Sequence, residues 1–166
     1  MAKSDDAADA RLRGVVEDAF REAAGGKRPD ADTVSIVAAC AGLLACVAYA
    51  DRELSPSELE KTARLLEDVS GITDSGRRAI VAALQAHIVE LSSVHAVRFA
   101  RTLKELGDRD LRLHVVGILL ALAAADDAIS PAEVNTLRQV TRALGLTQED
   151  YNLLQLEHRE KLATLR

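Results

Sequence analysis

The chain has 166 residues, of which 48% are hydrophobic, 28% are charged and only 2% are aromatic, and its net charge is −5. This balance excludes an extensively disordered chain and predicts one globular domain with a core of small aliphatic side chains. With few aromatic residues and no basic stripe, we expect no nucleic-acid partner. The polar N-terminus has no apolar signal region, and the two cysteines, Cys40 and Cys46, match neither a zinc site nor a disulfide framework, so a cytoplasmic protein is expected.

The periodic stretches all have the spacing of helices. The opening stretch has apolar residues three and four positions apart and ends at Gly25-Gly26, which predicts a helix over 5–24. Residues 1–31 are expected to form this N-terminal helix and a linker. The next predicted helix, 33–50 with Asp32 as N-cap, contains 17 residues without a charge, "VSIVAACAGLLACVAYA". This run is too short and too rich in small residues for a membrane span, so it predicts a buried central helix.

Further helices are predicted from the turn and cap signals that follow. Their expected ranges are 55–70, 73–91, 94–106, 111–125, 130–144 and 147–163. Short connections between helices are typical of antiparallel neighbours in a bundle. The sequence therefore predicts an all-α bundle of about seven helices over residues 32–166, in addition to the N-terminal helix.

A short acidic turn occurs twice, each time after an apolar helix. The stretch "ADRELSPSE" covers residues 50–58, and "ADDAISPAE" covers residues 125–133, an offset of 75 residues. At the same offset Gly42 falls on Gly117. Each half has an apolar helix, an acidic turn, an amphipathic helix, a glycine and a capped helix. The sequence predicts an internal duplication, with halves at about 32–91 and 108–163, packed about a pseudo-two-fold axis.

This doubled pattern, an Ala-rich apolar helix followed by "AD", an apolar residue, Ser and Glu, resembles the TerB-like family. That family includes the tellurite resistance protein TerB and related N-terminal domains of DnaJ-like membrane co-chaperones. The resemblance covers about residues 33–163. It implies a TerB-like helical bundle and a role in resistance to tellurite or another chemical stress, through a divalent cation bound at the acidic turns. The family commonly has glycine after the turn aspartate, where this chain has Arg52 and Asp127.

Helix initiation alone explains part of each turn. The stretches Ser55-Pro56-Ser57-Glu58 and Ser130-Pro131-Ala132-Glu133 have the pattern of a capping box, with proline in the first helical turn. In a capping box the serine hydroxyl accepts a hydrogen bond from the glutamate N–H, and the glutamate carboxylate accepts one from the serine N–H. The serine, proline and glutamate of each turn therefore require no ligand.

The aspartates of the turns need another explanation. Asp51 and Asp126 follow the C-termini of apolar helices, where the helix dipole disfavours a negative charge. They either accept backbone hydrogen bonds within the turn, or form an acidic docking surface, or bind calcium, magnesium or zinc. An EF-hand is excluded, because proline stands where its loop needs glycine. The candidate metal ligands are Asp51, Glu53, Glu58, Asp126, Asp127 and Glu133.

No catalytic residue is predicted. The sequence contains no glycine-rich phosphate loop, nucleophile elbow or HExxH motif, so we expect a non-enzymatic protein with no cofactor other than a divalent cation. The alternative function is a protein–protein interaction module that docks a membrane-associated or chaperone complex. The basic stretch from Arg98 to Arg112 then forms either a solvated helix face or a dock for an acidic partner. The sequence predicts neither the identity of the partner nor the oligomeric state.

Overall fold

The computed structural model describes residues 2–50, 52–67, 69, 71–92, 95–124 and 129–164. These residues form nine α-helices and no β-strand, which confirms the predicted all-α bundle. The helices are α1 (Ala2–Ala23), α2 (Ala31–Ala48), α3 (Pro56–Glu67), α4 (Asp74–Ala86), α5 (Ile88–Ser92), α6 (His95–Leu106), α7 (Arg109–Ala123), α8 (Pro131–Ala143) and α9 (Gln148–Thr164).

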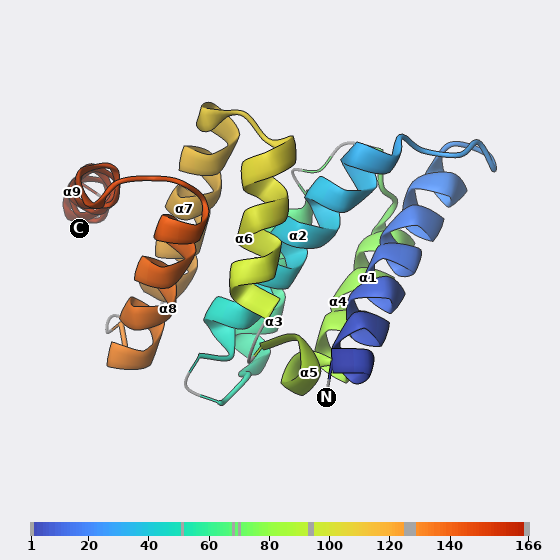
Figure 1. The fold of residues 1–166 in the computed structure, drawn as a ribbon, viewed down its shortest axis with the longest axis horizontal. Coiled ribbons are helices and arrows are strands. Elements are labelled where there is room, and N and C mark those ends of the chain that lie inside the picture. The colour runs from blue at the N-terminus through green and yellow to red at the C-terminus, as the bar shows by residue number, and fades with distance from the viewer. Residues whose placement is uncertain are drawn as a thin grey trace.

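The apolar helix α2 occupies the centre of an elongated molecule, with α1 and α9 at its two ends (Figure 1). It packs against α1 and against each of the helices α3 to α8. Among the described helices, α2 alone is long and apolar enough to cross a membrane, and 67% of it is buried inside the protein. The charge-free run thus forms the central core helix that its composition predicts.

The N-cap of α2 differs from the predicted one. Asp30 caps the helix, and its carboxylate accepts hydrogen bonds from the backbone N–H and the hydroxyl of Thr33, at 3.0 and 3.1 Å. The assignment of Asp32 was wrong, because the extended backbone that a cap requires lies two residues earlier. Asp32 lies in the first turn, where the helix dipole favours its charge.

The single helix predicted over 73–91 is two helices in the structure. At His87 the backbone leaves the helical conformation, with φ of −119° and ψ of 18°, and α5 begins at the next residue. The break directs α5 onto α2 and α1, where Ile88 and Leu91 become buried. Neither glycine nor proline occurs at this point, so tertiary packing decides the break.

The N-terminal helix α1 shares the hydrophobic core of the bundle. Leu12, Val16 and Ala19 are buried, and α1 packs against α4, α2 and α5. At the contact with α4, Gly76 lies directly beside Ala19, because a β-carbon on Gly76 would be 2.8 Å from the Ala19 methyl group. Residues 2–23 are therefore packed onto the helices that follow.

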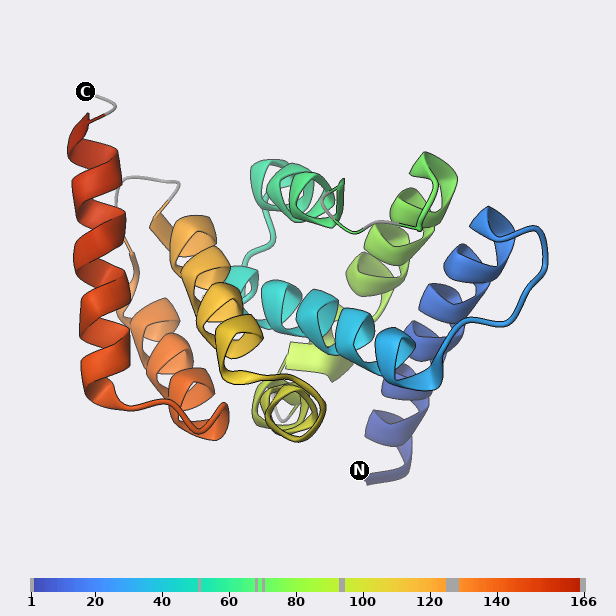
Figure 2. The same ribbon diagram turned by 90° about the horizontal axis from the view of Figure 1, so that it is seen from above.

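The helix series α2–α3–α4 and α7–α8–α9 are built with the same local devices. Proline opens both α3 and α8, a glycine with positive φ follows each of them (Gly71 at +85° and Gly145 at +73°), and Thr73 and Thr147 accept hydrogen bonds at the starts of α4 and α9. In Figure 2, α4 and α9 lie on opposite outer sides of the central α2–α7 pair. The internal duplication remains a prediction. It requires two series of three helices with matching starts and stops, and the series α2–α3–α4 and α7–α8–α9 meet this requirement.

Candidate functional site

The first acidic turn begins where α2 ends, and its backbone adopts a conformation that usually requires glycine. The N–H of Arg52 donates to the Tyr49 carbonyl oxygen at 2.9 Å, and Arg52 has a φ of +66°. It is the non-glycine residue with positive φ in the described part of the chain. The glycine common at this position in the TerB-like family is therefore replaced by an arginine that adopts the left-handed conformation itself.

We expect Arg52→Gly to raise the free energy of unfolding by about 0.5–1 kcal/mol. The left-handed conformation costs an L-residue about 1–2 kcal/mol, and the greater freedom of glycine in the unfolded chain offsets part of this gain. Urea denaturation followed by circular dichroism measures the change. Arg52→Ala is the control, because it removes the side chain and keeps the strain. An equal gain from alanine would mean that the side chain, and not the backbone, is unfavourable.

Both predicted capping boxes form. In the first, the Glu58 carboxylate accepts hydrogen bonds from the Ser55 N–H and hydroxyl, each at 2.8 Å, and the Glu58 N–H donates to the Ser55 hydroxyl at 3.2 Å. In the second, Ser130 and Glu133 make the same reciprocal pair of backbone bonds, at 2.8 and 3.2 Å. Both glutamates are buried. Their carboxylates are therefore engaged in starting α3 and α8.

Glu58→Ala and Glu133→Ala are each expected to lower the free energy of unfolding by about 1–2 kcal/mol. Each change leaves the serine N–H without its acceptor, and the loss of a helix cap costs about 1 kcal/mol. Thermal and urea denaturation of the single variants measures the effect. Glu60→Ala, which removes an exposed carboxylate from the same helix, is the control and should change stability little. Unchanged stability of both box variants would contradict a structural role.

The other candidate metal ligands have different placements. Asp51, Asp126 and Asp127 lie outside the described residues. Glu53 is exposed, and it already makes an interaction within the protein. Within the described ranges, no three or more His, Cys, Asp or Glu side chains come together as metal ligands would. A cation site at the turns would therefore depend on the three aspartates and Glu53, with Glu58 and Glu133 retained by their caps.

A cleft between α2, α3 and α7 was not predicted from the sequence. It has a volume of about 290 Å³ and is partly open to solvent. Among the described residues that line it, Cys40 and His114 alone have polar side chains, and the others are aliphatic. Its lining residues are Ile36, Val37, Cys40, Leu44, Leu65, Leu66, Val69, Leu111, His114, Val115 and Ile118.

The two thiols are poor nucleophiles in this environment. Burial raises the pKa of Cys40 and that of Cys46 to about 12, because a thiolate would lose its hydration there. The Cys46 thiol lies 3.2 Å from the Leu91 carbonyl oxygen, to which it donates. The chemistry of a reactive cysteine is therefore disfavoured in the cleft.

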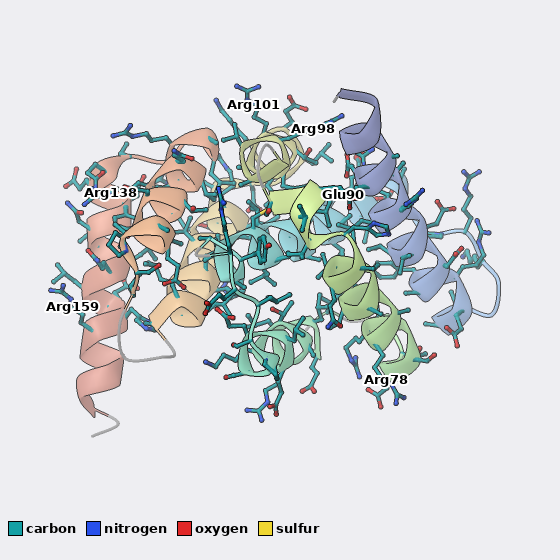
Figure 3. The ribbon with its side chains drawn as sticks, turned by 90° about the horizontal axis from the view of Figure 1, so that it is seen from below. Arg78, Glu90, Arg98, Arg101, Arg138 and Arg159 are labelled. Carbon is teal, nitrogen blue, oxygen red and sulfur yellow. The ribbon has the colours of Figure 1, made fainter. Side chains whose placement is uncertain are left out.

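The basic stretch divides into structural and exposed arginines. Arg109 forms an ion pair with Asp150 of α9 at 2.7 Å, and Arg112 donates to the Leu144 carbonyl oxygen at 2.8 Å. The pKa of Asp150 is lowered by the hydrogen bond from the Thr147 N–H and by Arg109. These contacts hold α7 to the helices that follow it. The labelled side chains of Arg98 and Arg101 lie on the outer side of α6 (Figure 3).

Comparison with known proteins identifies the family. The family model described as tellurite resistance protein TerB matches residues 37–156. The chain belongs to the TerB family. The match begins within α2 and ends within α9, so this TerB-family protein has both acidic turns and every lining residue of the α2–α3–α7 cleft except Ile36 inside the matched region. No curated protein and no solved structure matches the chain.

Proposed function

We propose that this TerB-family protein is a non-enzymatic binding protein that acts in the response to tellurite or another chemical stress. The match of the tellurite resistance family to most of the chain is the observation that carries the proposal. Deletion of the gene in its host is expected to lower survival on tellurite, and re-expression of the full chain should restore it. Equal survival of the deleted and restored strains on tellurite and on other metal and oxidant stresses would reject the proposal.

A divalent cation at the acidic turns is the binding activity that we propose first. Asp51 and Asp126 follow the C-terminal ends of α2 and α7, and these two helix ends point toward the same end of the bundle (Figure 1). Helix C-termini leave carbonyl oxygens unpaired, and carbonyl and carboxylate oxygens are ligands that calcium and magnesium prefer. The proposal assigns the binding to Asp51, Glu53, Asp126 and Asp127.

Isothermal titration calorimetry with calcium, magnesium and zinc tests this assignment. We expect the wild type to bind one of these ions and Asp51→Ala/Asp126→Ala to lose that binding. Asp32→Ala/Asp110→Ala is the matched control, since it removes the same charge from exposed positions in the first turns of α2 and α7. Identical heats for all three proteins at millimolar metal would reject cation binding at the turns.

The second candidate function is a protein–protein interaction module, which would dock a membrane-associated or chaperone complex. The open apolar cleft favours it, because contiguous exposed apolar surface on a folded protein commonly marks an interaction site. Photocrosslinking in cells from positions distributed over the surface, with and without a metal chelator, separates the two candidates. A partner captured equally in both conditions supports the module, and no captured partner from any position rejects it.

A further inference from the structure

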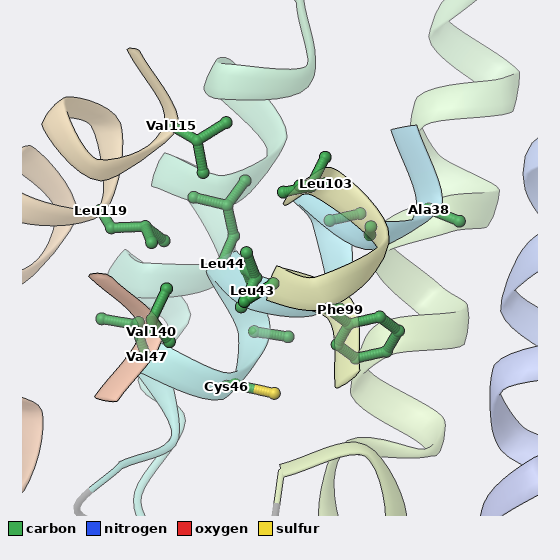
Figure 4. Close-up of a cluster of buried hydrophobic side chains, with 14 of the residues drawn as sticks. Ala38, Leu43, Leu44, Cys46, Val47, Phe99, Leu103, Val115, Leu119 and Val140 are labelled. Atoms are coloured by element: carbon green, nitrogen blue, oxygen red, sulfur yellow. The ribbon is translucent and has the colours of Figure 1, made fainter. Parts of the chain in front are cut away.

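The contact of α6 with its neighbouring helices shows how this bundle binds an amphipathic helix. Helix α6 packs against α2 and α8, and its residues Phe99 and Leu103 are buried. The Phe99 ring lies on Gly42 of α2, where a β-carbon would come within 2.4 Å of a ring atom. Figure 4 shows Leu103 in one cluster of buried side chains with Val115 and Leu119 of α7. Helices α2 and α8 thus form a groove that α6 fills.

The predicted duplication relates this groove to the α2–α3–α7 cleft. An offset of 75 residues exchanges α2 with α7 and α3 with α8, and the structure contains both cross-contacts that this exchange requires, α3 with α7 and α8 with α2. The same offset places Cys40 on Val115 and Leu44 on Leu119. Leu44 lines the cleft, and its counterpart Leu119 lies in the cluster with Leu103, so the predicted duplication places the cleft at the position of the α6 groove. Val115, the counterpart of Cys40, lines the cleft itself.

One half of the bundle fills this groove, and the other leaves it open. On α2, Gly42 lies beneath the Phe99 ring of α6, and Ala39, Leu43 and Cys46 of the same helix are buried. The equivalent positions on α7 are His114 and Ala121, which are exposed, and Gly117 and Ile118, which are half-buried. No atom lies within 4 Å of a β-carbon built on Gly117, whereas three atoms of the Phe99 ring lie within 2.7 Å of one built on Gly42.

We propose that the cleft between α3 and α7 is the docking seat for an amphipathic helix of a partner protein. The partner helix presents an aromatic residue and a leucine four positions apart, as α6 presents Phe99 and Leu103. The aromatic ring lies on Gly117, and the leucine enters the cleft over Cys40 and Leu44. Residues four apart share one face of a helix, and such a helix binds an apolar groove through that face. This inference rests on the second proposed function.

The amphipathic sequence of α6 is itself the probe. A peptide of residues 95–106, stapled between positions 98 and 102 to keep it helical, is added to the full-length 15N-labelled protein. We expect saturable amide shift changes around Leu65, Gly117 and Ile118. The same peptide with Phe99→Ala and Leu103→Ala should cause none. Amide shift changes around Gly42 instead would show that the peptide replaces α6 in its own groove, and would overturn the assignment to the cleft.

Gly117→Val is the matched protein variant. Its side chain enters open space on α7, so the fold should be unaffected, while the close approach of the aromatic ring is blocked. We expect peptide affinity to fall by about tenfold or more, the effect of forcing extra methyl groups into a packed contact. Unchanged peptide affinity would overturn the proposal. Amide shifts of the cleft that change with protein concentration in the absence of peptide would also overturn it, because a second copy of the chain would then fill the cleft. A cellular partner crosslinked only at another face would reject this seat and leave the interaction module standing.

Discussion

Replacement of Phe99 by alanine is expected to lower the free energy of unfolding by about 3–5 kcal/mol, the range for truncating a fully buried phenylalanine. The ring is 3% exposed and lies at the contact between α6 and α2. Its loss removes the largest side chain of α6 from the core and leaves a cavity above Gly42. Few other positions can show so large a loss on truncation, because the sequence contains only two phenylalanines.

Urea denaturation monitored by circular dichroism measures this change. Leu153→Ala is the control, since Leu153 on α9 is 55% exposed and its truncation should change stability by less than about 0.5 kcal/mol. If Phe99→Ala proves too unstable to purify, Phe99→Leu provides a smaller truncation at the same contact. A loss from Phe99→Ala no larger than that from the control would contradict the seating of α6 on α2.

Alanine at Gly42 and at Gly117, which the predicted duplication places at equivalent positions, is expected to change stability in opposite directions. At Gly42 the new methyl group meets three Phe99 ring atoms at 2.4–2.7 Å. Such overpacking costs about 1–3 kcal/mol, which exceeds the gain of about 1 kcal/mol from replacing glycine inside a helix. At Gly117 the methyl group meets no atom within 4 Å, so only the gain of about 0.5–1 kcal/mol remains.

Chemical denaturation of the single variants Gly42→Ala and Gly117→Ala, and of the double variant Gly42→Ala/Phe99→Leu, tests this expectation. The smaller leucine side chain should reduce the loss caused by Gly42→Ala, because it gives the new methyl group room. Additive losses in the double variant would show that the methyl group and the ring do not compete for the same space. Changes of the same sign at Gly42 and Gly117 would contradict the difference between the filled and the open groove.

Much of the fold was predictable because its signals are local. The capping boxes at Ser55 and Ser130 depend on side chains three residues apart, so the sequence alone places the starts of α3 and α8. The charge-free run that begins at Val34 likewise predicts the central position of α2. The cap of α2 was misplaced by two residues because Asp30 and Asp32 are both acceptable caps, and only the path of the chain chooses between them.

The candidate site was less predictable, because it depends on contacts between distant segments. The candidate ligands Glu58 and Glu133 proved to be engaged in capping bonds, a structural role that the sequence had already suggested. Half-exposed apolar residues such as Leu65 and Ile118 follow a helical stripe, yet a stripe does not show whether another helix covers it. The cleft was therefore recognisable only from the relative positions of α2, α3 and α7 in the structure.

The sequence by itself determined the helical class and most helix starts of this TerB-family protein, because caps, glycine stops and helical periodicity act within a few residues. Tertiary structure alone decided the break at His87, the left-handed backbone of Arg52 and the difference between Gly42 and Gly117. These features depend on which surfaces meet. Gly42 is covered by Phe99 and Gly117 is open, although each lies inside an apolar helix, because packing is decided between helices and not within them.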